Sequence, residues 1–306
     1  MGNAPPTEIS LALVVAGYVG LLAAVVVWMA VAARARRGLP VIPYVWRRPV
    51  PWNAIHVIAI LLLYLGLAVA SQRSAIWLFD LPVVDAPAAV QPDKPHLVVT
   101  LLRESHTPAT LLLCFISVVV VAPIVEEFVF RVVLQGWLEA VEMRLRRQIP
   151  ALRRLIPGAA PVVLISLLFG GMHYRIGNAQ PDPHVIAHLM ASDTAARVVT
   201  LLLAIGLLRW GAGAKAEDLG WVREKLFPDA RLGILAFLGI GVLIYSLKIF
   251  LARFLPQNVA DPLVMFVFAA ILGTLYCRTH RIAAAIVLHL VLNLTSLTME
   301  WFRLAG

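Results

Sequence analysis

The feature that most constrains this chain is the repetition of long apolar segments along its 306 residues. A bilayer hydrocarbon core about 30 Å thick needs about 20 apolar residues in each helix that crosses it. About eight segments approach that length, and they lie near residues 9–33, 54–70, 108–143, 161–174, 195–210, 232–251, 262–277 and 282–301. The sequence therefore predicts an all-α fold, a polytopic transmembrane helical bundle of about eight spans.

Composition agrees with a membrane protein. Hydrophobic residues make up 61% of the chain and charged residues only 14%, whereas a soluble domain is nearer half apolar and a quarter charged. The net charge of +9 would suit nucleic acid, but the basic residues cluster just beyond the apolar segments. Basic residues in that position mark the cytoplasmic side and face anionic headgroups. Membrane lipids are therefore expected partners, and nucleic acid is not.

Two arginine-rich segments, 34–48 and 144–154, set the expected orientation. One long helix over 108–143, kinked at Pro123, places both segments on the cytoplasmic side, whereas a break at this proline would leave the second outside. We therefore expect one kinked helix and both termini outside. A single domain over 1–306 suffices, in a multi-pass protein of a bacterial-type plasma membrane.

Charged residues interrupt the third apolar segment in the stretch VEEFVFR, residues 125–131. An ionisable residue at membrane depth costs about 2.5–3.5 kcal/mol on insertion scales and marks a functional site by default. Glu127 and Arg131 share a helix face and can neutralise each other. Glu126 is displaced by about 100° around the helix and needs a partner from another helix or a proton. It suits a general acid or base, although polar pairs also join membrane helices.

Two other stretches carry polar groups inside apolar segments. The sequence FGGMH places His173 in a span whose glycines permit close helix approach. His289 and Asn293 share one face of the last span, four residues apart. At 1.5 Å per residue, Glu126 lies roughly 27 Å from the outer end of its span, and the two histidines lie roughly 18 Å and 10 Å from the inner ends of theirs. All three side chains are therefore expected to meet in the cytoplasmic half of the bilayer.

A further pair of histidines has the spacing of metal ligands. His184 and His188 are four residues apart in HVIAH, a stretch expected in an outer loop. Because no third ligand is near, we interpret them as polar loop residues.

The motifs EExxxR, FxxxH and HxxxN, in that order, resemble the signature of the CPBP (Abi) intramembrane proteases. This family includes the type II CAAX prenyl endopeptidases and bacteriocin-processing or self-immunity proteins. The resemblance is strongest over residues 122–139, 168–174 and 271–294. It implies an endopeptidase that cuts a peptide or protein substrate near the cytoplasmic membrane face. In CAAX-processing members the substrate is lipidated.

The resemblance also implies roles for individual residues. Glu126 would activate water, with Glu127 and Arg131 supporting it, and His173 would orient the water or bind a metal. His289 and Asn293 would stabilise the oxyanion. These groups supply the base, the proton donor and the positive partial charge that amide hydrolysis needs. Two mechanisms stay open: Glu126, His173 and His289 hold a zinc ion, or the glutamate acts without metal.

The chain departs from the family pattern in one respect. Members usually have a short gap between the second and third motifs, whereas over a hundred residues separate His173 from His289. We therefore expect an unusual helical insertion at about 177–260 and a rearranged helix order. Two other classes remain as alternatives: a non-catalytic peptide-binding or bacteriocin-immunity protein of the same fold, and a proton-coupled transporter.

Overall fold

The structure is a computed structural model that describes residues 11–42, 44–80, 97–105, 107–174 and 182–305. Every regular element in these residues is helical, as expected where a lipid core offers no partner to backbone groups, and the predicted all-α fold is confirmed. The α-helices are α1 (Leu11–Arg36), α2 (Ala54–Leu78), α3 (Leu97–Glu104), α4 (Pro108–Cys114), α5 (Ala122–Glu127), α6 (Gly136–Gln148), α7 (Ala159–Met172), α8 (Pro183–Gly206), α9 (Leu226–Ala252), α10 (Gln257–Thr279) and α11 (Ile282–Ala305).

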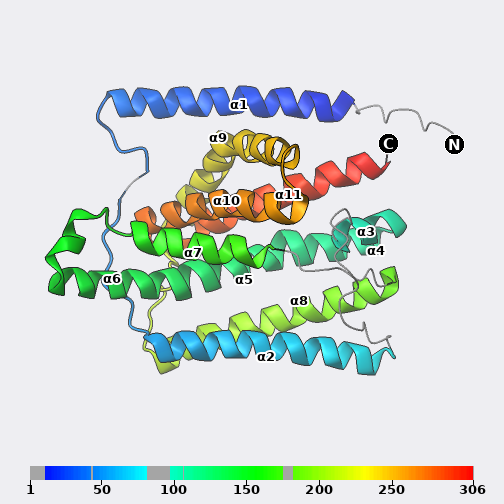
Figure 1. Cartoon of the computed structure of the whole chain (residues 1–306), viewed down its shortest axis with the longest axis horizontal. Helices are drawn as coiled ribbons and strands as arrows, with labels where there is room; N and C mark the ends of the chain where they lie inside the picture. The colour runs from blue at the N-terminus through cyan, green and yellow to red at the C-terminus, as the bar shows by residue number, and fades with distance from the viewer. Residues whose placement is uncertain (1–10, 43, 81–96, 106, 175–181, 306) are drawn as a thin grey trace.

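The described helices include seven that are long and apolar enough to cross a membrane. The predicted span at 161–174 corresponds to α7, which has 14 residues. At about 21 Å this helix is shorter than the hydrocarbon core, so seven of the about eight expected spans have full length among the described helices. The beginning of α1 and the end of α11 lie at the same end of the molecule (Figure 1).

The third span is one continuous helix over Pro108–Gln148, so the prediction of a single helix is confirmed. Two π-helical segments interrupt its α-helical geometry: η1 (Phe115–Val121) and η2 (Phe128–Gln135). At the end of η1 the Ala122 N–H bonds to the Ser117 carbonyl, five residues back. The next carbonyl in that register, Val118, faces Pro123, which has no N–H to give.

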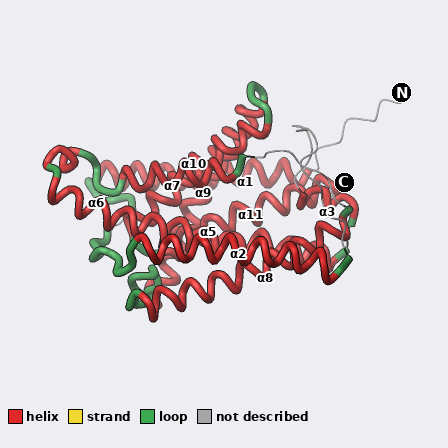
Figure 2. Tube along the Cα trace, turned by 60° about the horizontal axis from the view of Figure 1, so that its bottom comes forward, coloured by secondary structure: helices red, strands yellow, loops and turns green. Residues whose placement is uncertain are grey.

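Helices far apart in sequence pack in pairs: α7 with α10, α9 with α11, and α2 with α8 (Figures 1 and 2). Glycine permits the first of these contacts, because a Cβ on Gly170 would lie 2.7 Å from the Pro262 carbonyl oxygen. The prediction that the FGGMH glycines permit close approach holds for this residue. A Cβ on Gly171 would meet nothing within 4 Å, so the second glycine has no such role.

The loop predicted at His184 and His188 is instead the beginning of α8. The Asp182 carboxylate accepts a hydrogen bond of 2.8 Å from the His184 N–H, and Pro183 occupies the first turn. An N-cap aspartate followed by proline is a helix-start signal. This signal predicts a helix that begins at residue 183, well before the expected start at residue 195. The four-residue spacing of these histidines is therefore helical periodicity.

Candidate active site

Glu127 lies at the centre of a buried trio of charged and polar side chains. Its Oε1 accepts a hydrogen bond of 2.9 Å from Nδ1 of His289, and its Oε2 accepts one of 3.1 Å from Nε of Arg131. The side chains of Glu127 and Arg131 are fully buried, and that of His289 is 5% exposed. A buried carboxylate is costly unless it is paired in this way. The trio therefore ties the third span to α11, and it contains the predicted Glu127–Arg131 pair.

Glu126 faces a different helix. Its Oε1 lies 3.4 Å from Nη1 of Arg197 on α8, and Nε of the same arginine lies 2.6 Å from Oδ2 of Asp193. The Glu126 side chain is 23% exposed, whereas that of Glu127 is not exposed at all. The partner that Glu126 required from another helix is therefore an arginine. The carboxylate also stays partly exposed.

His289 connects the two glutamates. Because Nδ1 is hydrogen-bonded to Glu127, the Nε2 atom points toward Glu126, at 3.9 Å from Oε2. That distance is too long for a hydrogen bond. The outer nitrogen of the ring is therefore oriented toward the accessible carboxylate, and it is positioned to contact a third group such as a water or a carbonyl oxygen.

His173 lies beside this group across an aromatic ring. Its Nδ1 is 2.8 Å from the Phe169 carbonyl oxygen, to which it donates, so Nε2 is the acceptor of the neutral imidazole. The Phe169 ring contacts the rings of both His173 and His289, with centroid separations of 4.7 Å and 6.1 Å. The structure thus brings Glu126, Glu127 and His289 into one cluster and places His173 next to it.

Asn293 lies one turn beyond His289 on the predicted face, but its amide is engaged elsewhere. Its Nδ2 donates a hydrogen bond of 2.9 Å to the Val118 carbonyl. This is the carbonyl that Pro123 leaves without a partner in the π-helical register. The Asn293 side chain therefore supplies the hydrogen bond that the Val118 carbonyl lacks within the third span.

Two residues beside Glu126, Arg197 and Asp193, were not predicted from the sequence. Arg197 lies inside the predicted span 195–210. An arginine at membrane depth is costly and marks a functional site by default, as a glutamate does. Asp193 precedes it by four residues, which is the spacing of a helical ion pair.

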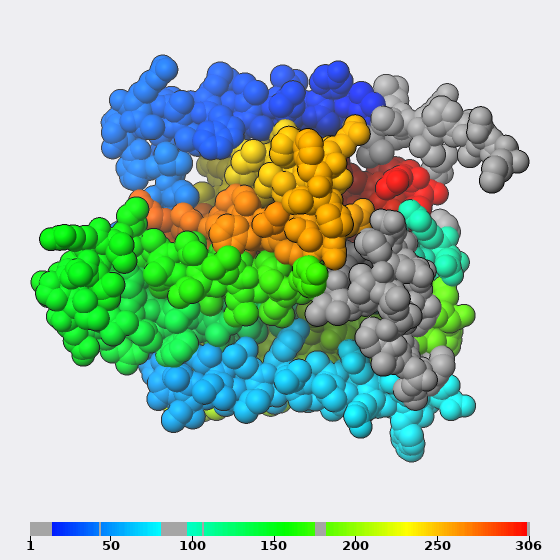
Figure 3. Space-filling view, in the orientation of Figure 1, coloured from blue at the N-terminus to red at the C-terminus, as the bar shows by residue number. Residues whose placement is uncertain are grey.

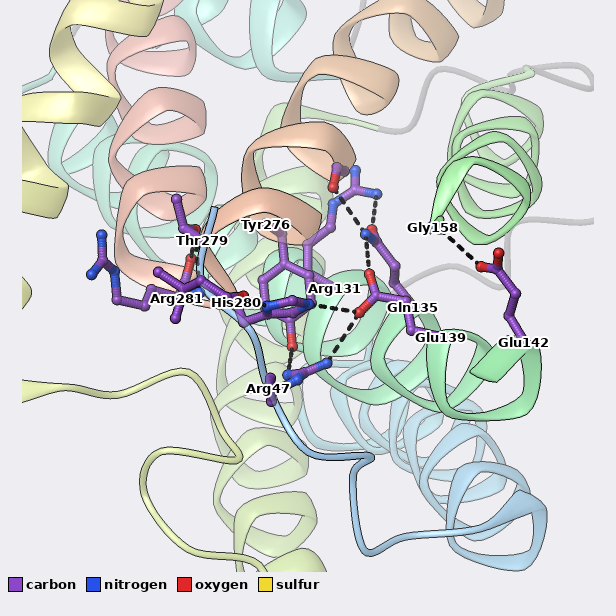
Figure 4. Close-up of polar contacts among 12 residues, drawn as sticks. Arg47, Arg131, Gln135, Glu139, Glu142, Gly158, Tyr276, Thr279, His280 and Arg281 are labelled. Carbon is purple, nitrogen blue, oxygen red and sulfur yellow. Dashed lines mark hydrogen bonds and ion pairs between the residues drawn. The ribbon is translucent and has the colours of Figure 1, made fainter. Parts of the chain in front are cut away.

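Buried polar side chains also continue below Arg131 in a row that was not predicted from the sequence (Figure 4). Arg131 Nη1 lies 3.4 Å from Oε1 of Gln135, whose Nε2 donates to Oε1 of Glu139 at 3.0 Å. The residues continue the four-residue period of Glu127 and Arg131, so extending that period in the sequence would have found them.

The row ends at the arginine-rich end of the bundle. Oε2 of Glu139 lies 3.2 Å from both Arg47 Nη2 and His280 Nε2 (Figure 4). Burial lowers the pKa of Arg47, but Tyr276 and Glu139 outweigh that effect and raise the pKa above its ordinary value. The guanidinium stays charged, so it fastens the segment before α2 to the end of this row.

The predicted metal-ligand set of Glu126, His173 and His289 is not assembled in this structure. Among the residues that the structure describes, no three His, Cys, Asp or Glu side chains are grouped so that they could hold a metal ion. The Nδ1 atoms of both histidines are engaged with Phe169 and Glu127, which leaves Nε2 of each ring as the nitrogen that could contact a ligand.

The fold and the site together define a class: a multi-pass membrane protein in which carboxylates and imidazoles from separate helices meet inside the bundle. The chain matches the family model described as Type II CAAX prenyl endopeptidase Rce1-like over residues 108–295, which is more than half its length. It therefore belongs to the Rce1-like family and is, at that level, an integral membrane protease. All six predicted site residues lie in the matched range. The comparisons with curated proteins and with solved structures found no match.

Proposed function

We propose that the chain is an intramembrane endopeptidase in which Glu126 activates the attacking water. The observation that carries this proposal is the contrast between two adjacent glutamates. Glu127 is fully buried between His289 and Arg131, whereas the Glu126 side chain is 23% exposed. A general base must reach both water and substrate, and of the two carboxylates only Glu126 is accessible.

The proposed reaction uses the side chains of the cluster. Glu126 accepts a proton from water as the water oxygen bonds to the scissile carbonyl carbon. His289, held by Glu127, presents Nε2–H of its protonated ring to the developing oxyanion. Glu126 then passes the proton to the leaving nitrogen as the C–N bond breaks. The products are a carboxyl group and an amine.

Neighbouring residues position these groups. Arg197 fixes the orientation of Glu126 from the opposite helix, and Arg131 balances the charge of Glu127. His173 presents its acceptor nitrogen and can orient the attacking water. Asn293 holds the Val118 carbonyl, which preserves the π-helical geometry before the glutamates, and its second amide hydrogen can face the oxyanion.

The substrate class follows from the family. The name of the matching family points to CAAX-type peptides, so we propose a hydrophobic, lipidated C-terminal segment as the substrate. By the positive-inside rule, the arginine-rich end of the bundle is cytoplasmic. We propose that the membrane is a bacterial-type plasma membrane. Cleavage would then occur near the cytoplasmic face.

A second function is favoured by one contact. Arg197 already neutralises Glu126, as it would in a protein that uses the glutamate only to join helices. A non-catalytic peptide-binding or immunity protein of the same fold would have this arrangement.

One experiment distinguishes the two functions. Membranes containing the wild type, Glu126→Gln or the control Glu224→Gln, which alters an exposed carboxylate just before α9, are compared by proteomics for trimmed C-termini. Proteolysis predicts that trimming falls at least about a hundredfold in Glu126→Gln alone. Trimming that persists in this variant would remove the role of Glu126. A protective phenotype that survives in it, with no trimming by the wild type, would establish the binding protein.

A further inference from the structure

An apolar groove of about 630 Å³ lies between α1, α9 and α10, away from the candidate active site. Its volume is within the range of ligand pockets, about 300–1,000 Å³. Helix α1 stands against α9, where Nε1 of Trp28 donates a hydrogen bond of 2.8 Å to the Gly239 carbonyl. The surface is hollowed between α1 and α10 (Figure 3).

The walls of the groove suit a hydrocarbon chain. They are formed by aliphatic and small side chains such as Val27, Val31, Leu235, Ala236, Val267 and Ala270. A polar side chain on the α10 wall, Thr274, donates its hydroxyl to the Ala270 carbonyl within its own helix. Apolar surface of this kind gains free energy when an acyl chain covers it.

Each of the three walls ends in an exposed arginine at the same end of the groove. Arg34 follows the wall residue Val31 by three positions, Arg231 directly precedes Leu232, and Arg278 lies one turn beyond Thr274. Their spacing along the walls gives the groove an apolar body and a basic mouth.

Within the part of the chain that the structure describes, no carboxylate balances the charges at this mouth. Arg34 donates hydrogen bonds of 3.3 and 3.0 Å to the Pro40 carbonyl, and Arg278 donates one of 3.3 Å to the Ile42 carbonyl. Among the described residues, these two arginines and Arg231 form no ion pair with an acidic side chain. The Arg278 guanidinium also lies over the Tyr44 ring, 5.3 Å from its centroid. Guanidinium groups that have no carboxylate partner are suited to binding a phosphate.

We propose that this groove binds an anionic phospholipid of the surrounding membrane. One acyl chain lies between α1, α9 and α10, and the phosphate lies among Arg34, Arg231 and Arg278. Basic side chains at a membrane surface attract anionic headgroups, and here three arginines follow or precede the wall residues at one end of an apolar groove of suitable volume. The bound lipid would fasten α1 to the bundle, independently of any proteolysis.

The test uses the full chain purified in detergent and probed by native mass spectrometry. Phosphatidylglycerol and phosphatidylcholine with the same acyl chains are added separately to the wild type. We expect phosphatidylglycerol to stay bound and phosphatidylcholine to dissociate at the same collision energy. Equal retention of the two lipids by the wild type overturns the proposal, and this comparison needs no variant to fold.

Variants then locate the site. Arg231→Gln with Arg278→Gln should weaken phosphatidylglycerol binding about thirtyfold, whereas the control Arg253→Gln, at the other end of α9, should not. Ala270→Phe, which fills the groove, should weaken it while leaving the arginines in place. Unchanged binding in the double variant, or a second copy of the chain occupying the groove, would contradict the lipid site.

Discussion

Nδ1 of His289 lies 2.9 Å from Oε1 of Glu127, and this bond joins the last helix to the third span across 162 positions of the sequence. It fixes which nitrogen of the imidazole carries the inner proton, and it points the other nitrogen toward Glu126. The adjacent glutamates therefore differ in role, because one positions the histidine while the other remains accessible.

We therefore predict that Glu127→Gln and Glu126→Gln differ in stability although both lose cleavage. The first leaves the buried Arg131 without a carboxylate, which costs about 3–5 kcal/mol. The second removes one partly exposed ion pair, which costs about 1 kcal/mol or less. Thermal unfolding of the purified variants measures the difference. Equal melting temperatures would show that the buried trio does not stabilise the helix contact.

Arg197→Lys should lower the rate of cleavage with little effect on substrate binding. Lysine keeps the charge but lacks the planar fork with which Arg197 contacts Asp193 and Glu126 together. A misplaced base lowers kcat, and we expect a fall of about tenfold or more with KM within about twofold. The control is Arg209→Lys near the end of the same span, where the arginine donates to the Ala214 carbonyl. An unchanged kcat would mean that Arg197 serves only helix packing.

Local periodicity explains what could be predicted from the sequence. The Glu127–Arg131 pair and the shared face of His289 and Asn293 follow from the four-residue helical repeat. The contact between Glu126 and Arg197 depends instead on how α8 packs against the third span, and no local pattern specifies that packing. The hydrogen bond from Asn293 to the Val118 carbonyl could not be predicted for the same reason, because it depends on how α11 packs against the third span.

The role of Asn293 can be separated into backbone support and chemistry by a double-mutant cycle. Asn293→Ala leaves the Val118 carbonyl without its donor, and we expect a loss of about 1 kcal/mol in the free energy of unfolding. In a Pro123→Ala background the N–H of residue 123 can serve that carbonyl, so the same substitution should cost much less.

The cleavage assay completes this cycle. If Asn293 also faces the oxyanion, Asn293→Ala stays impaired in the Pro123→Ala background even though its stability is recovered. Recovery of both stability and cleavage would assign the residue to backbone support alone. Equal destabilisation in the two backgrounds would show that Pro123 is not the reason for the contact.

The two glycines before His173 offer the last prediction. A Cβ at position 170 would lie 2.7 Å from the Pro262 carbonyl oxygen and 3.1 Å from the Phe266 Cβ, and neither atom belongs to the far end of a flexible side chain. Gly170→Ala should therefore push α7 away from α10, lower the free energy of unfolding by about 1–3 kcal/mol and displace His173. Gly171→Ala, which meets open space, should leave both stability and cleavage nearly unchanged. Thermal unfolding and the cleavage assay measure the pair, and equal effects at the two positions would mean that close packing of α7 on α10 does not hold His173 in place.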